Sequence, residues 1–159
     1  MIYLGIDPGT SKDEPGGIGI IQELKTSTTV ACWSMPSDNK KIFSLIREIS
    51  GLDNIFCCIE EQQIFKGFDI AKARVLIMHY GALLMALEAS GIEPHTVLPK
   101  VWQNAILGPT TKGQTKEVSL QLARITYPEL GKDLKLAKDH GKADALHLAE
   151  YAEVMSRME

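Results

Sequence analysis

The run NIFCCIE, residues 54–60, constrains the fold of this chain more than any other stretch. Its middle is apolar at every position, and it ends in charge at Glu60. A half-buried strand would alternate apolar and polar residues, whereas an unbroken apolar run is typical of a central strand covered on both faces. We therefore expect helices on both sides of a sheet that contains this strand.

The remaining elements follow from hydrophobic spacing and turn residues. Alternating apolar residues predict a strand over 2–7, which Pro8-Gly9 ends, and a polar, hairpin-like connection over 10–17 follows. Three strands come first and helices then alternate with two more strands, which favours an α/β fold with a five-stranded mixed sheet flanked by helices. Further strands are predicted at 18–22, 28–33 and 95–99, and helices at 40–50, 69–90, from Pro99, within 111–128 and at 140–155.

Length and composition are those of an ordinary globular protein. A chain of 159 residues can bury its own core, so we expect a single domain over 1–159. We see neither a secretory signal pattern nor a run of roughly 18 apolar residues that would cross a membrane. Two of the three cysteines, Cys57 and Cys58, lie in the apolar run and are typical of buried thiols. We expect a soluble, intracellular protein without a membrane segment.

Charge is distributed unevenly along the chain. The net charge is −3 overall, but residues 99–143 contain eight basic and four acidic residues, which makes this segment net +4 and the remainder net −7. A nuclease with a basic binding surface and an acidic metal centre would have this distribution, although a solvated, lysine-rich helical surface would have it too. The basic residues are Lys100, Lys112, Lys116, Arg124, Lys132, Lys135, Lys138 and Lys142.

Three acids occupy positions at which ligand sites form in α/β sheets. Asp7 ends the first predicted strand, Glu60 ends the fourth, and Asp144 lies in the first turn of the last predicted helix. The carboxyl ends of neighbouring parallel strands meet at one edge, and strands are ~4.8 Å apart, so two such carboxylates can share one divalent ion. Carboxylate oxygens suit Mg²⁺, and two ions can hold an attacking water and a leaving oxygen across a phosphodiester.

Each of these acids also has a simpler interpretation. An Asp before Pro-Gly is common in turns, and an acid opening a helix stabilises its N-terminus through the macrodipole. Glu60 and its neighbour Glu61 would be ordinary solvated residues after a strand. Because all three acids occur in this order at these positions, a shared metal site explains them better than three unrelated local roles.

Five motifs together resemble the RuvC family of Holliday-junction resolvases, and the likeness spans essentially the whole chain. It is stronger to the phage and chloroplast branch than to the bacterial enzymes. The resemblance implies an RNase H-like fold and a homodimer that nicks two strands of a four-way DNA junction. It also implies Mg²⁺ or Mn²⁺, two per site, and products with 5′-phosphate and 3′-hydroxyl ends. The motifs are GIDPGT, IEEQ, HTVLPKVWQ, TK before a helix, and DHGKADALHLAEY.

The same resemblance implies the site residues. Asp7, Glu60 and Asp144 correspond to metal ligands of the family, with Glu60 preferred over Glu61 because it directly follows the apolar CCI. Bacterial members place a fourth ligand three residues before the last aspartate, where this chain has Gly141. Asp139 and His140 are the available substitutes. Asp139 offers a hard oxygen and is our preferred catalytic residue, whereas His140 shares a helix face with Asp144.

DNA contacts and the dimer interface are predicted from the same likeness. Bacterial relatives use an aromatic residue shortly after the glutamate, for which Phe65 and Phe68 are candidates; both could instead pack against the helix at 69–90. We expect Lys112 and Lys116, with Lys100 and Lys142, to approach DNA phosphates. The long apolar helix at 69–90 is the expected dimer interface.

Two alternatives remain beside a junction resolvase. A related nuclease that cuts flaps or RNA–DNA hybrids would have the same metal site, and a catalytically inactive protein could keep the fold for junction binding alone. GIDPGT is also similar to the phosphate loop of actin-like ATPases, but those need two such domains, which 159 residues do not supply.

Overall fold

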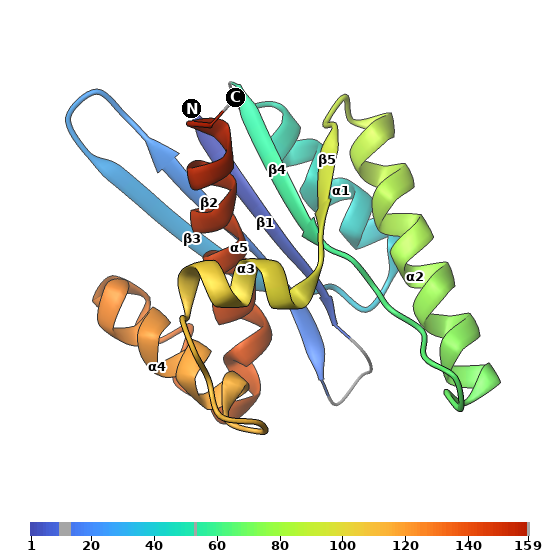
Figure 1. The fold of residues 1–159 in the computed structure, drawn as a ribbon. Coiled ribbons are helices and arrows are strands. Elements are labelled where there is room, and N and C mark those ends of the chain that lie inside the picture. Colours follow the sequence, from blue (N-terminus) through green and yellow to red (C-terminus); the bar gives the residue numbers. More distant parts are fainter. Residues whose placement is uncertain (10–13, 53, 159) are drawn as a thin grey trace.

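The computed structural model describes residues 1–9, 14–52 and 54–158, so part of the predicted connection over 10–17 lies outside the described residues. A five-stranded sheet has the order β3-β2-β1-β4-β5 (Figure 1). The first three strands form an antiparallel meander, and β4 and β5 continue from β1 in parallel. This confirms the predicted mixed sheet. The strands are β1 Ile2–Gly9, β2 Pro15–Glu23, β3 Thr28–Ser34, β4 Ile55–Glu60 and β5 Pro94–Val97.

Helices cover both faces of the sheet. The helices α1 and α2 pack on one face, whereas α5 crosses the other face and α3 and α4 lie beside it (Figure 1). Short 3₁₀ turns, η1 and η2, connect α4 to α5. The bounds are α1 Asn39–Ser50, α2 Ile70–Ala89, α3 Pro99–Ile106, α4 Thr115–Thr126, η1 Pro128–Leu130, η2 Ala137–Asp139 and α5 His140–Ser156.

Strand β4 is covered on both faces, as its apolar run predicts. Cys57 and Cys58 are both fully buried, but they belong to different parts of the core. Cys57 packs in the cluster between the sheet and the helices α1 and α2, together with Ile46. Cys58 packs in the cluster that contains Trp102 and Leu148 of α3 and α5. The two adjacent thiols therefore point to opposite sides of the sheet.

Helix α5 lies very close to β1 and β2 because glycine occupies the contact. A Cβ atom at Gly5 would lie 2.0 Å from the carbonyl oxygen of Ala145 and 2.4 Å from the backbone nitrogen of Ala149. At Gly17 it would lie 2.4 Å from the carbonyl oxygen of Gly141. This close approach brings the beginning of α5 to the carboxyl end of β1. Asp144 follows directly after the first turn of α5 rather than lying within it, as the sequence had led us to expect.

Helix α2 is apolar on nearly all sides, but the sheet covers only part of it. Leu76, Leu83, Ala86 and Leu87 are buried, and its remaining surface is largely exposed. By length and composition α2 is the one described helix that could cross a membrane, with a mean hydropathy of 1.4 and 22% of that segment buried. A single helix of this kind is weak evidence for a membrane protein. Its exposed apolar residues are Ile70, Val75, Ile77, Met78 and Met85.

Candidate functional site

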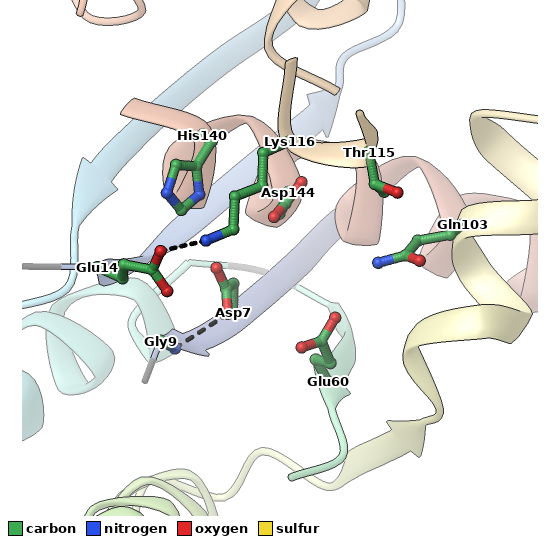
Figure 2. Close-up of a pocket in the computed structure, with 9 residues that line it drawn as sticks. All are labelled: Asp7, Gly9, Glu14, Glu60, Gln103, Thr115, Lys116, His140 and Asp144. Carbon is green, nitrogen blue, oxygen red and sulfur yellow. Dashed lines mark hydrogen bonds and ion pairs between the residues drawn. The ribbon is translucent and has the colours of Figure 1, made fainter. Parts of the chain in front are cut away.

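A pocket of about 230 Å³ lies where the carboxyl ends of β1 and β4 meet the first turns of α4 and α5 (Figure 2). It brings Asp7, Glu60, His140 and Asp144 together, and Lys116 joins them from α4. In Figure 2 the three carboxylates approach one another from three separate elements. The full lining is Asp7, Gly9, Glu14, Glu60, Gln103, Thr115, Lys116, His140 and Asp144.

Asp7 both caps a turn and faces the pocket. Its Oδ1 accepts a hydrogen bond of 2.9 Å from the backbone N–H of Gly9, which has a positive φ of 71°. The positive φ favours glycine at this position. Gly9 is the last residue of β1 and still pairs with Pro15 of β2, so the strand continues past Asp7 instead of ending there as predicted. Ile6 of β1 lies beside Ile59 of the parallel strand β4, so Asp7 and Glu60 emerge next to each other at the same edge of the sheet.

Glu60 and Asp144 are each held by a buried donor from a different helix. The indole Nε1 of Trp102 donates a 2.8 Å hydrogen bond to Oε2 of Glu60, and Trp102 is fully buried. The hydroxyl of Ser119, also fully buried, donates to Oδ1 of Asp144. The helices α3 and α4 therefore orient two of the three acids.

Burial raises the pKa values of all three acids, and neighbouring carboxylates raise those of Glu60 and Asp144 further. Burial raises the pKa of Asp7 to about 6. Burial, and next the charge of Asp7, raises the pKa of Glu60 to about 7 and raises that of Asp144 well above its ordinary value. One buried and two half-buried carboxyl groups are costly to ionise together, which is the electrostatic condition that a bound cation would relieve.

Of the two residues considered for a fourth ligand, His140 lines the pocket and Asp139 does not. The ring nitrogen Nδ1 of His140 is one of three buried side-chain atoms without a hydrogen-bond partner in the part of the chain that the structure describes. Burial, and then the charge of Lys116, lowers the pKa of His140, which favours the neutral ring that ligates metals. Asp139 lies outside the pocket lining, because its Oδ2 accepts from the backbone N–H of Leu136 and its Oδ1 pairs with Lys142 at 3.0 Å.

Gly141 leaves no room for a fourth ligand at the position that bacterial RuvC proteins are expected to use. A Cβ atom there would lie 2.3 Å from the carbonyl oxygen of Pro15, because α5 contacts the beginning of β2. A side chain at 141 would force α5 away from the sheet.

The donor set fits a hard divalent cation that keeps part of its own solvent shell. Among the described residues, no group of three or more His, Cys, Asp or Glu side chains is close enough to form a ready-made metal site. Mg²⁺ and Mn²⁺ are commonly held by one or two carboxylates together with waters and substrate phosphates. The three carboxylates and the unpartnered His140 nitrogen match that mode of binding.

The other residues predicted to contact DNA lie outside the pocket, except Lys116, which forms an ion pair with Glu14 across it (Figure 2). Lys100 and Lys112 are exposed in and after α3, whereas the side chain of Lys142 is only 13% exposed beside Asp139. Phe65 and Phe68 are 66% and 38% exposed in the segment between β4 and α2.

Sequence reasoning missed five residues at or behind the pocket. Glu14, Gln103 and Thr115 line it, and Trp102 and Ser119 hold its acids. Thr115 lies in the TK pair, and Trp102 and Gln103 lie in HTVLPKVWQ, but these motifs gave none of them a role. Glu14 and Ser119 carried no signal, because an acid in a polar connection and a serine in a helix look like ordinary residues.

The mixed sheet, with α5 across one face and acids at the carboxyl ends of its strands, is an α/β architecture of the RNase H-like kind. A structure of Thermus thermophilus RuvC in complex with Holliday junction substrate has a TM-score of 0.61 and 21% sequence identity, over 99% of this chain and 96% of that chain. A second Thermus thermophilus RuvC structure has a TM-score of 0.56 and 20% identity, over 98% and 97%.

The likeness to RuvC is thus confirmed at the level of the fold. No protein-family model matches this sequence, and no curated protein matches it significantly. The resemblance that the motifs indicated therefore rests on three-dimensional structure, and the residue roles rest on the geometry of the pocket.

Proposed function

We propose that this chain is a divalent-metal-dependent endonuclease that resolves four-way DNA junctions. One observation carries the proposal: Asp7, Glu60 and Asp144 converge from β1, β4 and α5 on one pocket, within a fold like that of RuvC. One of the similar RuvC structures is a complex with Holliday junction substrate. A basic segment borders the acidic pocket, as junction DNA would require.

Asp7, Glu60, Asp144 and His140 would hold two Mg²⁺ or Mn²⁺ ions. Such ions orient an attacking water and a leaving oxygen in line and offset the charge that develops on the phosphate. The charge of Asp7 raises the pKa values of both Glu60 and Asp144, so Asp7 lies close to both of the other acids. In this proposal Asp139 shapes the turn before α5 and takes no part in binding metal.

Lys116, Lys112 and Lys100 would bind DNA phosphates on the side of the sheet that carries α3 and α4. Lys116 lies at the pocket and would exchange Glu14 for a phosphate when DNA binds. Lys142 is paired with Asp139 and contributes charge rather than a direct contact.

The active species in this proposal is a homodimer formed through α2. A two-fold axis would present two pockets to two strands, which gives paired nicks with 5′-phosphate and 3′-hydroxyl ends. The partner subunit, rather than lipid, would cover the exposed apolar face of α2, consistent with a soluble protein inside the cell. The exposed Phe65 and Phe68 would then stack on bases near the crossover.

The decisive experiment compares three labelled substrates, a four-way junction, a flap and a linear duplex, with Mg²⁺ or Mn²⁺. We expect paired nicks in the junction alone, which DNA ligase can reseal directly. Glu60→Gln should abolish cutting, whereas Glu61→Gln, its matched neighbour outside the pocket, should cut normally.

Two other results would contradict the proposal, and each would favour a different function. Equal cutting of flap and junction would make the protein a broader branch nuclease. Tight junction binding without cutting in either metal would make it a junction-binding protein that has lost catalysis.

A further inference from the structure

A buried hydrogen-bond network runs behind Asp144, away from the pocket. His147 lies one turn after Asp144 on α5 and is fully buried. Its Nε2 lies 3.0 Å from the carbonyl oxygen of Ser119, and its Nδ1 lies 2.9 Å from Oε2 of Glu150. The hydroxyl of Tyr127, at the end of α4, donates to Oε1 of Glu150 at 2.6 Å. We call Tyr127, Glu150, His147 and Ser119 the buried network; Glu150 is its partly exposed member, with 20% of its side chain exposed.

The partners of His147 fix where its protons lie. A carbonyl oxygen only accepts, so Nε2 of His147 carries a hydrogen and donates it to Ser119. Nδ1 faces a carboxylate oxygen of Glu150, and a hydrogen bond there requires a second proton between the two atoms. The buried network is therefore satisfied only as a unit, because removing one member leaves a buried polar group without its partner.

Ser119 connects this network to the pocket. Its carbonyl oxygen accepts from His147, and its hydroxyl donates to Oδ1 of Asp144. The residue is fully buried between α4 and α5, so it cannot bind DNA directly. With Oδ1 taken by Ser119, Asp144 is fixed in one orientation and retains Oδ2 for a ligand in the pocket.

We propose that Ser119 is a positioning residue for Asp144 and that Tyr127, Glu150 and His147 hold Ser119 in place for this task. The inference rests on the metal site of the proposed function. A buried polar pair is by itself weak evidence for stability, since apolar residues of similar size often stabilise a core as well. Groups that hydrogen-bond to metal ligands commonly change metal affinity or activity 10–100-fold when they are removed.

The test measures Mn²⁺ binding to the full-length, DNA-free protein from the spin-resonance signal of free Mn²⁺, alongside junction cleavage. For Ser119→Ala we expect an Mn²⁺ dissociation constant raised about tenfold and a lower kcat. The KM for the junction should be unchanged, because Ser119 does not reach the surface. Ser119→Cys, similar in shape with a weak donor, should lie between Ser119→Ala and the wild type.

Two further variants separate positioning from packing. Tyr127→Phe removes a hydroxyl that lies outside the pocket lining, and we expect a smaller rise of the Mn²⁺ dissociation constant, about two- to threefold. Ser156→Ala is the matched control, because its hydroxyl donates to the carbonyl oxygen of Glu153 near the end of α5 and Ser156 does not line the pocket. It should leave Mn²⁺ binding unchanged.

The outcomes distinguish this inference from the proposed function. If Ser119→Ala lowers the melting temperature but keeps wild-type Mn²⁺ binding and kcat, the buried network only packs α4 on α5 and the inference is overturned. The proposed function would still stand in that case, provided that the wild type cuts junctions. A wild type that neither binds Mn²⁺ nor cuts DNA would overturn both.

Discussion

At the scale of single residues, Asp7 shows how a functional group can oppose stability. It is a carboxyl group with only 8% of its surface exposed, and its pKa is raised from 3.8 to about 6 chiefly by burial. Because the folded protein binds this proton more tightly than the unfolded chain does, the protein is most stable below the pKa that Asp7 has in the unfolded chain. Its stability then falls as the pH rises through about 6, when the buried carboxyl group must ionise.

Asp7→Asn should therefore stabilise the metal-free protein at neutral pH while abolishing cleavage. An asparagine stays neutral and still offers an oxygen to the N–H of Gly9. We expect a gain of roughly 1–3 kcal/mol at about pH 8, shrinking towards zero near pH 4, where the wild-type carboxyl group is itself largely protonated. Urea unfolding without divalent cations at both pH values measures this difference, and a loss of stability at pH 8 would contradict it.

At the scale of elements, the contact between α5 and the sheet decides whether the pocket exists. Gly5→Ala should destabilise the protein by about 3 kcal/mol or more, because the added methyl group would meet backbone atoms of α5 that no side-chain rotation can move. Thermal unfolding measures the loss. The matched control is Gly51→Ala at the end of α1, where φ is −72° and the nearest atom is 3.3 Å away. It should change stability by no more than about 0.5 kcal/mol.

A second prediction at this scale concerns DNA binding by the segment between α3 and α4. Lys112→Ala should weaken junction binding and reduce the slope of log Kd against log salt by about 1, because one phosphate contact is lost. Binding titrations between about 50 and 200 mM salt measure the slope. Lys40→Ala on α1, which lies on the opposite face of the sheet, should leave it unchanged. Equal slopes for wild type and Lys112→Ala would show that Lys112 makes no phosphate contact.

At the scale of the whole molecule, α2 links the proposed dimer interface to the pocket. Nε2 of His79 on α2 donates a 3.0 Å hydrogen bond to the carbonyl oxygen of Pro8, the residue after Asp7. The buried side of α2 thus touches the strand that carries the central acid, while its exposed side presents an apolar surface.

Met78→Glu should convert a dimer to a monomer without unfolding the protein. Met78 is 63% exposed, so the charge costs the monomer little but would be buried against a partner subunit. We expect monomers in sedimentation experiments and unpaired nicks in the junction. Val154→Glu on α5 adds the same charge to another exposed apolar position and should remain dimeric. A dimeric Met78→Glu variant would place the interface elsewhere.

The local sequence determined the order of the elements and three of the acids. Hydrophobic spacing and turn residues predict strands and helices because they act between near neighbours, and the unbroken apolar run at 55–59 required helices on both faces of the sheet. The predicted end of the first strand was wrong: β1 continues to Gly9 rather than ending at Asp7, because β2 pairs with it as far as Pro15. Strand length depends on the partner strand as well as on the strand itself.

Only the tertiary structure decided how the acids are held and which of two neighbouring residues lies at the pocket beside them. Asp139 and His140 are adjacent in the sequence, yet one faces Lys142 and the other faces the pocket. Trp102 reaches Glu60, and Ser119 reaches Asp144, across more than twenty residues of chain. Such pairings leave no local pattern, because a hydrogen bond between distant segments depends on packing that the whole chain must complete first.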